Sequence, residues 1–325
     1  MKILVSGAHG FIGSHIVQHL LKAGSEVIAL VSPWGSTRNL EADSCHPALT
    51  IVYGDITDPI SLRNIPKHTV VIHAAARVAD WGSSNLTEKV NVNGTWNLLR
   101  RAEELGVTRF VLISSVAVHR YTGFKNADPR SVPRDRHSLP YARSKIQAED
   151  IVLTSHSLEG VVIRPGLWPF GPRDPQFSRI LSALQKGRLP VVNSGKAVIN
   201  TAYVENLVHG IELATYRPEA VGKTYVIADE GAPSWAQLFK NIADQVGCPT
   251  PQVSIPGWLA SPAGIVMEKL FALVSPSTEP PLTGYRGQLM LRNVHFDITC
   301  TRRELGYHPK IPWQEGIRRT LEAVI

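Results

Sequence analysis

Cysteine is scarce in this sequence, and charge of one sign never gathers into a run. The three cysteines, Cys45, Cys248 and Cys300, lie far apart and outside any Cys-x-x-Cys pair. This pattern predicts neither a disulfide framework nor a zinc site, and it is typical of a reducing compartment. Hydrophobic residues make up 43% of the 325 residues and charged residues 19%, which excludes a largely disordered or low-complexity chain.

The excess of positive charge is small and diffuse. Lysine and arginine number 34 against 27 aspartates and glutamates, a net charge of +7, and the arginine pairs are scattered. Because nucleic-acid binding needs a basic stripe, we expect no nucleic-acid partner, whereas an anionic cofactor or a membrane surface fits a diffuse excess. The sequence opens directly into a strand at Lys2 without a signal peptide, so we expect a cytoplasmic protein.

Short β-rich runs alternate with helical stretches through the first half of the sequence. The run Phe110–Ile113 is apolar on both faces, as expected of a strand covered by helices on each side. This alternation predicts an α/β fold with a parallel sheet. A closed barrel would also fit the alternation, but the glycine pattern described below favours a doubly wound sheet. The predicted strands are Lys2–Ser6, Glu26–Val31, Leu49–Tyr53, Val70–His73, Arg109–Ser114 and Gly160–Arg164, and the clearest predicted helices are Ile12–Ala23, Leu86–Leu105 and Tyr141–Ser155.

The composition changes after Pro165, where proline and glycine cluster in RPGLWPFGPRDP. Thr224–Ile227 again has the composition of a strand, so the chain is expected to return to the sheet there. The predicted division is a Rossmann-type dinucleotide-binding domain over residues 1–165, with 196–228 returning to it, and a smaller, discontinuous C-terminal substrate-binding region over 166–195 and 229–325.

Three glycines follow the first predicted strand and open a helix. Gly7 permits a tight turn, Gly10 lets the backbone approach a pyrophosphate, and Gly13 lets helix and strand pack closely. The spacing is GxxGxxG rather than the commoner GxGxxG, so its position between a strand and a helix carries the argument. We expect Phe11 and Ile12 of the same motif to contact the dinucleotide; the alternative is a turn that uses glycine only for its backbone freedom.

The end of the second predicted strand bears on which dinucleotide is bound. An acidic residue there would select NAD through the ribose hydroxyl, but this position is Ser32, and Arg38 follows nearby. Since Arg38 could pair with a 2′-phosphate, NADP is favoured over NAD. Asp55 and Ile56 follow the third predicted strand and are expected at the adenine, although Asp55 could equally cap the next turn.

Two Tyr-x-x-x-Lys pairs offer an acid–base group for carbonyl and alcohol chemistry. On a helix, positions i and i+4 share a face, and a lysine there can lower the pKa of a tyrosine. The pair Tyr121–Lys125 lies in a stretch rich in loop-forming residues, whereas Tyr141 and Lys145 follow a proline suited to a first helical turn. Tyr141 and Lys145 are therefore the predicted pair.

A hydrogen-bond donor to the substrate oxygen is expected just past the strand that ends near Ser114. Ser115 is the predicted donor and Ser114 the second choice, although either could merely cap a turn. His15 and His19 also lie four residues apart, but no third ligand accompanies them, so no metal site is predicted.

These motifs together resemble an extended short-chain dehydrogenase/reductase, most closely its 3β-hydroxysteroid dehydrogenase and dihydroflavonol reductase branch. The resemblance covers essentially the whole chain and rests on GAHGFIG, GDITD, HAAARVADWG, NVNGTWNLL, VLISSVAVH, YARSK, RPGLWPFGPRD, NTAYVENLVHGIELA and the closing FDITCTRRELGYHPKIPWQEGIRRT. It implies an NAD(P)-dependent oxidoreductase acting on a small hydrophobic substrate of the 3β-hydroxysteroid or long-chain β-hydroxy/β-keto type.

The resemblance also implies residue roles. Tyr141 would be the general acid/base, Lys145 its activator and ribose ligand, and Ser115 the group that orients the carbonyl. The remaining implied roles are a cofactor lining at Ala74, Ala75 and Ala76, a supporting side chain at Asn91, and a nicotinamide contact at Pro165. The sequence departs from the pattern at His119, where many relatives have tyrosine, and at Ser32.

Two other functions share this fold. A sugar-nucleotide epimerase or dehydratase uses the same tyrosine and lysine, but Val116 and Ala117 stand where a dehydratase of this superfamily has an Asp–Glu pair. Epimerases of the family look committed to NAD through an acid that Ser32 replaces. A non-catalytic cofactor-binding protein is the third alternative, and the intact Ser115, Tyr141 and Lys145 set argues against it.

The segment Ile255–Val274 is apolar and about the length of a membrane span, although it is interrupted by Pro262, Gly264, Glu268 and Lys269. The favoured interpretation is a buried helix covering the substrate. The alternatives are an interfacial helix that lets an apolar substrate enter from a membrane, and a true span. A homodimer face through Leu86–Leu105 and Tyr141–Ser155 is what the resemblance suggests.

Overall fold

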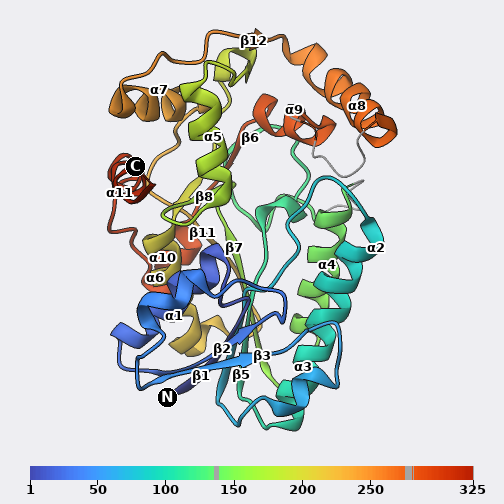
Figure 1. Cartoon of the computed structure of the whole chain (residues 1–325), viewed down its shortest axis with the longest axis vertical. Coiled ribbons are helices and arrows are strands. Elements are labelled where there is room, and N and C mark those ends of the chain that lie inside the picture. Colours follow the sequence, from blue (N-terminus) through green and yellow to red (C-terminus); the bar gives the residue numbers. More distant parts are fainter. Residues whose placement is uncertain (135–138, 275–279, 281, 325) are drawn as a thin grey trace.

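The computed structural model describes residues 1–134, 139–274, 280 and 282–324. Within them, seven parallel strands form one sheet in the order β11-β7-β5-β4-β1-β2-β3 (Figure 1). Because β11 and β3 are free edges, the sheet is open, and the predicted doubly wound α/β fold is confirmed. The strands are β1 (Lys2–Ser6), β2 (Glu26–Val31), β3 (Leu49–Tyr53), β4 (Val70–His73), β5 (Arg109–Ile113), β7 (Glu159–Pro165) and β11 (Thr224–Ile227).

Alternate residues of each strand feed two apolar layers, one on each face of the sheet. Ile3 and Val5 belong to the layer that contains α1 and α6, whereas Leu4 belongs to the layer under α3 and α4. A strand covered on both faces must be apolar at every position, which is why these runs were recognisable in the sequence. The four covering helices are α1 (Phe11–Lys22), α6 (Val204–Tyr216), α3 (Gly94–Glu104) and α4 (Pro140–Leu153).

The predicted helix over Leu86–Leu105 is present, but it is not α-helical throughout. It consists of α2 (Ser84–Glu88), a π-helical turn over Lys89–Asn93, and α3. π-helical turns occur mostly as single insertions and often at functional sites. Asn91, one of the predicted supporting residues, lies within this turn and is buried.

The remaining elements gather at the end of the molecule opposite the N-terminus and along one side of the sheet (Figure 1). Three two-stranded parallel pairs, β8–β10, β9–β12 and β6–β13, join distant segments there. Their strands are β6 (Phe124–Ala127), β8 (Trp168–Phe170), β9 (Val191–Val192), β10 (Thr201–Tyr203), β12 (Ser254–Ile255) and β13 (Val294–Phe296), and the helices are α5 (Pro175–Gln185), α7 (Trp235–Val246), α8 (Gly257–Val274), α9 (Gly284–Leu291), α10 (Thr299–Leu305) and α11 (Trp313–Val324).

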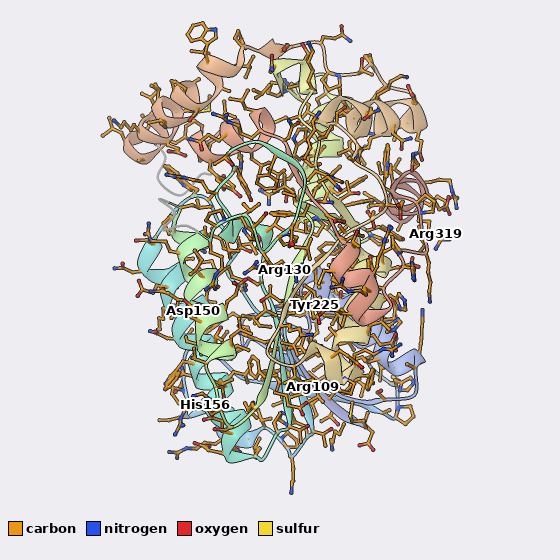
Figure 2. The ribbon with its side chains drawn as sticks, turned by 180° about the vertical axis from the view of Figure 1, so that it is seen from behind. Arg109, Arg130, Asp150, His156, Tyr225 and Arg319 are labelled. Carbon is orange, nitrogen blue, oxygen red and sulfur yellow. The ribbon has the colours of Figure 1, made fainter. Side chains whose placement is uncertain are left out.

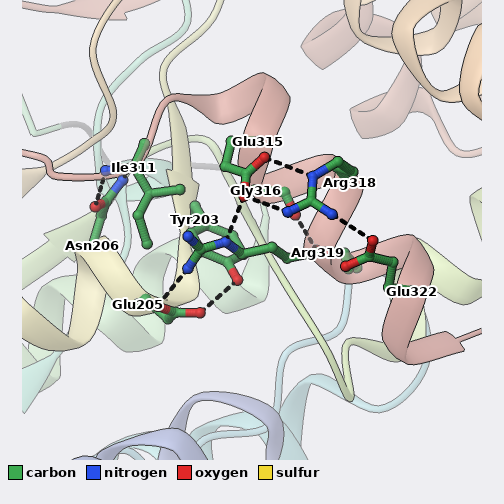
Figure 3. A network of polar contacts seen from close by, with 10 residues as sticks. Tyr203, Glu205, Asn206, Ile311, Glu315, Gly316, Arg318, Arg319 and Glu322 are labelled. Atoms are coloured by element: carbon green, nitrogen blue, oxygen red, sulfur yellow. Dashed lines mark hydrogen bonds and ion pairs between the residues drawn. The ribbon is translucent and has the colours of Figure 1, made fainter.

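The C-terminal helix α11 is attached to α6 by a polar network (Figure 3). Arg319 of α11 bonds Glu205 of α6, whose other oxygen accepts from the Tyr203 hydroxyl at 2.8 Å. Asn206 donates to the Ile311 carbonyl at 2.7 Å, just before α11 begins. The end of the chain is thereby joined to the element that follows β10.

On the reverse side, Arg109 joins strands to a helix end (Figure 2). Its guanidinium donates to Glu159 at the start of β7 and to the carbonyls of Thr215 and Arg217 at the end of α6. Tyr225 of β11, labelled in the same view, bonds the Glu219 carbonyl and Glu304 instead. These contacts lie away from the predicted reacting groups and serve the framework.

The prediction that Ile255–Val274 is a buried helix is wrong. The segment is helical as α8, but only Ala260 and Gly264 are buried, and Trp258 and Leu273 are 78% and 83% exposed. Small residues form its contact with α9, so the large apolar side chains face outward. Among the described residues, α8 is the one helix long and apolar enough to cross a membrane, and 11% of it is buried.

Candidate active site

The glycine motif lies at the carboxyl end of β1, where the chain turns into α1. Gly7 has a positive φ of 64°, and a Cβ there would lie 2.7 Å from the Ala75 backbone. A Cβ on Gly13 would lie 2.1 Å from the Gly7 carbonyl oxygen. The β1–α1 turn therefore needs glycine for its conformation and its close backbone contacts.

The N-terminus of α1 suits the pyrophosphate of a dinucleotide. Gly10 precedes α1 without a side-chain cap, and its first turn holds no acidic residue, so no side chain competes for the free N–H groups. Phe11 and Ile12 in that turn are partly buried, and Ala74, Ala75 and Ala76 follow β4 beside Gly7. The residues present fit the predicted cofactor, and their contacts with it stay predictions.

The residues expected near the adenine and its ribose have different surroundings. Ser32 accepts a bond from the Trp34 N–H at 3.4 Å, and Arg38 is exposed at the start of a short 3₁₀ helix. Both carboxylate oxygens of Asp55 accept bonds from Thr57 at 2.8 Å, as the turn-capping alternative requires. The side chain of Ile56 packs against Gly94 in the core, so any cofactor contact there would come from its backbone.

Tyr141 and Ser115 are brought together by α4 and the end of β5. Helix α4 begins with Pro140 in its first turn, which places Tyr141 at the start of the helix. Burial raises the pKa of Tyr141 to about 12, against a smaller lowering by its side-chain hydrogen bond with Ser115. Tyr141 is therefore a protonated phenol next to a serine hydroxyl at neutral pH.

Lys145 lies one turn further along α4 and is buried. Its Nζ donates to the Ile113 carbonyl at 2.7 Å, and burial lowers its pKa to about 8, against the raising effect of Glu149. The expected lowering of the tyrosine pKa by this lysine is not present in this conformation, because burial of the phenol outweighs other effects. Tyr121, of the competing pair, lies outside any helix, and Lys125 is in β6.

Ser114 has a different partner from Ser115. Its hydroxyl donates to the Glu149 carboxylate at 2.6 Å, and that carboxylate is fully buried. Glu149 also accepts two bonds from Arg164, at 2.8 and 2.6 Å, and one from Arg134. Ser114 is thus committed to a buried ion pair, which leaves Ser115 as the hydroxyl next to Tyr141.

His119 belongs to the same network. Arg164 donates to His119 Nε2 at 2.9 Å, so the proton of the neutral ring is on Nδ1, which donates to the Val132 carbonyl at 2.8 Å. Burial lowers the pKa of His119 to about 4, with the Arg164 charge adding to the effect. The histidine at this position has a structural partner for each ring nitrogen.

A second buried chain of hydrogen bonds, which sequence analysis missed, joins the cofactor loop to α4. Thr95 donates to the Asn91 carbonyl at 2.6 Å, so it accepts from His73 Nε2 at 3.0 Å, and His73 Nδ1 accepts from Ser6 at 2.6 Å. Burial lowers the pKa of His73 to about 3, so the ring is neutral.

The Asn91 side chain completes this chain. It accepts from the Arg77 N–H at 2.7 Å and donates to the Arg77 carbonyl and to Ser144. Ser144 in turn donates to the Tyr141 carbonyl at 2.8 Å. The π-helical turn therefore contacts both the loop after β4 and the start of α4, and the supporting role expected of Asn91 in the site stays a prediction.

The remaining predicted residues lie at the edges of this arrangement. Pro165 is buried at the carboxyl end of β7, opposite Ile227 of β11. His15 Nε2 lies 2.9 Å from the Pro172 carbonyl, and His19 pairs with Glu212 at 2.9 Å, so the two rings have separate protein partners.

Comparisons with known proteins show the family of the chain. Residues 3–228 match the model of the NAD dependent epimerase/dehydratase family. The chain is 30% identical to a 2-alkyl-3-oxoalkanoate reductase of Stenotrophomonas maltophilia over 98% of both chains. It is 29% identical to a 3β-hydroxysteroid dehydrogenase/Δ5→4-isomerase of Mycobacterium tuberculosis over 98% of this chain and 89% of that one. The resemblance inferred from the motifs is confirmed.

Solved structures share the fold over the whole chain. The crystal structure of gox2253 has a TM-score of 0.78 and 26% identity, covering 99% of this chain and 97% of that one. A Bacillus anthracis dTDP-glucose 4,6-dehydratase in complex with NAD has a TM-score of 0.78 and 20% identity, covering 100% and 96%. With the family model matching well over half of its residues, the chain belongs to the NAD dependent epimerase/dehydratase family.

Proposed function

We propose that the protein is an NAD(P)-dependent oxidoreductase that transfers a hydride between nicotinamide and a secondary alcohol or ketone. Its substrate would be hydrophobic, of the 3β-hydroxysteroid or long-chain β-hydroxy/β-keto type. The observation that carries the proposal is the convergence of Ser115, Tyr141 and Lys145 at the sheet edge that also holds the glycine turn. The activities named for the two relatives support the same reaction type.

The proposed roles follow from the protonation states. Tyr141 holds a proton at neutral pH and would donate it to the ketone oxygen during reduction, or accept one during oxidation. Ser115 would donate a hydrogen bond to the same oxygen and hold it in place. Lys145 would supply positive charge one helical turn away. The bound nicotinamide would give or take the hydride at its C4.

The proposed cofactor preference is NADP over NAD. Ser32 places no carboxylate at the end of β2, and Arg38 is exposed six residues later, where it could pair with a 2′-phosphate. The charge of the protein, +7, also favours the more anionic dinucleotide.

The test is nicotinamide turnover by the purified protein with NAD and NADP in parallel. The substrate panel holds 3β-hydroxysteroids and long-chain β-hydroxy acids in detergent, with Tyr141→Phe as the control. Turnover that the variant loses supports the proposal. If nothing on this panel is turned over and a separate product assay shows conversion of a sugar nucleotide, the epimerase alternative replaces the proposal.

Two further proposals concern partners. We propose a cytoplasmic protein that touches a membrane peripherally through α8, because its large apolar side chains are exposed on a basic protein. Flotation with anionic vesicles tests this, and protein that stays entirely in the soluble fraction contradicts it.

We also propose a homodimer through α2, α3 and α4, where Leu86 and Trp96 are exposed large apolar residues. Light scattering of the wild type and of Trp96→Glu tests this face. A monomeric wild type contradicts the proposal.

A further inference from the structure

A pair of phenols lies within electrostatic range of Tyr141. The Tyr121 and Tyr285 hydroxyls are 3.2 Å apart, with ring centroids separated by 6.0 Å. Ionised Tyr141 would raise the pKa of both, which places both rings within electrostatic range of the catalytic phenol. Tyr285 belongs to the first turn of α9, so a segment far along the chain contributes a hydroxyl beside the reacting one.

The first turn of α9 is fixed to the loop that follows β4. Arg286 contacts Asp80 with two nitrogens, Nε at 2.9 Å and Nη2 at 3.0 Å. Thr283 caps α9 by accepting from the Arg286 N–H, and it donates to the same carboxylate at 2.7 Å. A two-nitrogen arginine–carboxylate contact fixes direction as well as distance. The backbone on either side of Tyr285 is therefore held in one place.

The Tyr285 hydroxyl can donate to a ligand. Burial raises the pKa of both phenols, so both carry a proton, and either hydroxyl can donate in the bond that joins them. When Tyr121 is the donor in that bond, the Tyr285 O–H is left to bond a further group. Tyr285 is partly exposed, whereas Tyr121 is buried.

The loop after β4 carries two more donors of this kind. Within the described part of the chain, Arg77 Nε and Trp81 Nε1 are buried without a hydrogen-bond partner. The Arg77 guanidinium folds back over Gly82, where an added Cβ would lie 3.1 Å from Nη2. These donors flank Asp80, the residue bound to the first turn of α9. Buried donors without an acceptor are rare in folded proteins, and here they share one fixed unit with Tyr285.

We propose that Tyr285 and Arg77 form a second oxygen-binding subsite that recognises a carboxylate attached to the carbon next to the reacting carbon of the substrate. The inference rests on the proposed oxidoreductase function and narrows its substrate class to a β-hydroxy or β-oxo acid. Such an acid presents a charged carboxylate whose carbon lies two bonds from the reacting carbon; Arg77 supplies a positive charge to this carboxylate and Tyr285 a hydrogen-bond donor. A steroid that reacts at a ring-A oxygen and carries no carboxyl group on the neighbouring carbon would leave both donors without an acceptor.

The experiment compares three ligands with one carbon chain: a long-chain 3-hydroxy acid, its methyl ester, and the secondary alcohol that lacks the carboxyl group. We expect wild-type kcat/KM to be at least about tenfold higher for the acid than for the alcohol. Tyr285→Phe should lower the value for the acid by about tenfold, mainly through KM, and leave the alcohol unchanged. Arg77→Met should affect the acid but not the uncharged ester.

Tyr225→Phe is the matched control, because it removes a hydroxyl that bonds Glu219 and Glu304 on the far strand of the sheet. It should change neither substrate. The inference is overturned, with the proposed function intact, if the wild type prefers the alcohol or a 3β-hydroxysteroid without a carboxyl group, or if Tyr285→Phe lowers kcat/KM for the acid and the alcohol equally.

A separate binding measurement tests the subsite if the proposed function fails. If the wild type turns over no member of the panel, the oxidoreductase proposal fails on this panel. Calorimetric titration of the acid into the protein with NADP then decides the subsite. Binding that Tyr285→Phe weakens about tenfold supports the subsite, and absence of binding to the wild type overturns it.

Discussion

Replacing Glu149 by glutamine should destabilise the protein more than any other single change of similar size in α4. The Glu149 side chain is 0% exposed and its partner Arg164 is 6% exposed, joined by two hydrogen bonds at 2.8 and 2.6 Å. Glutamine keeps the shape but loses the charge and turns one acceptor into a donor facing the guanidinium. Breaking a buried ion pair in this way costs about 3–5 kcal/mol, because the remaining charge stays buried without compensation.

Urea denaturation at neutral pH measures this cost, with Arg134→Ala as the control. Arg134 also contacts Glu149, at 3.1 Å, but is 36% exposed, so its loss should cost about 1 kcal/mol or less. A loss below about 1 kcal/mol in Glu149→Gln would refute the reasoning that the Glu149–Arg164 pair is the main polar contact on this face.

The pH dependence of the stability difference between wild type and Glu149→Gln provides a second test of the ion pair. Burial raises the pKa of Glu149, but the hydrogen bonds and charge of Arg164, with Ser114 and Arg134, outweigh it and hold the pKa below its usual range. A carboxyl with a lowered folded pKa stabilises above its unfolded pKa of about 4.3 and loses that contribution as the pH falls further. The difference between wild type and Glu149→Gln should therefore shrink below about pH 4, and a constant difference would contradict the pair.

Four other outcomes follow from the site. Tyr141→Phe and Lys145→Ala should each lower kcat by at least about a hundredfold, measured by steady-state turnover, and near-normal turnover in either refutes its role. Gly7→Ala should weaken NADP binding at least about tenfold in a fluorescence titration, because its Cβ would meet Ala75 at 2.7 Å, whereas Gly24→Ala, with positive φ but open space, should leave binding unchanged. Arg38→Ala should raise KM for NADP by about tenfold and spare NAD; equal effects would remove Arg38 from cofactor choice. Stability should fall as the pH is lowered from 6.5 to 4, because His73 and His119 bind protons in the unfolded chain but stay neutral in the folded protein, where their pKa values are about 3 and 4. A melting temperature that does not change over this pH range would contradict this.

The sheet was predictable because the burial of its strands on both faces is reflected in continuous apolar runs in the sequence. A strand such as Phe110–Ile113, apolar at every position, has few structures open to it besides the middle of a covered sheet. The spacing of Tyr141 and Lys145 likewise places them on one helix face without knowledge of the fold. Glu149 lies four residues after Lys145 and therefore on the same helix face. Sequence analysis did not use this spacing.

The contacts that hold the loop after β4 were not predictable. Asp80 and Arg286 are 206 residues apart, and nothing local to either residue indicates the other. The π-helical turn at Asn91 was missed for a related reason, because helical periodicity over Leu86–Leu105 hides a single inserted residue. Hydrogen bonds from Asn91 to Arg77 and Ser144 depend on that insertion, so its role was visible only through the resemblance.

Helix α8 is apolar in composition but mostly exposed. Composition alone predicts a buried helix, yet its inner face is made of small residues, and a Cβ on Gly264 would lie 2.3 Å from the Thr283 backbone. Close backbone approach of this kind leaves little room for large side chains at Ala260 and Gly264, and Trp258 and Leu273 are exposed. Ala260 and Gly264, four residues apart, marked the contact face in the sequence. Helix α8 thus packs on α9 through its small residues. Its large apolar side chains remain exposed and are available to contact another surface.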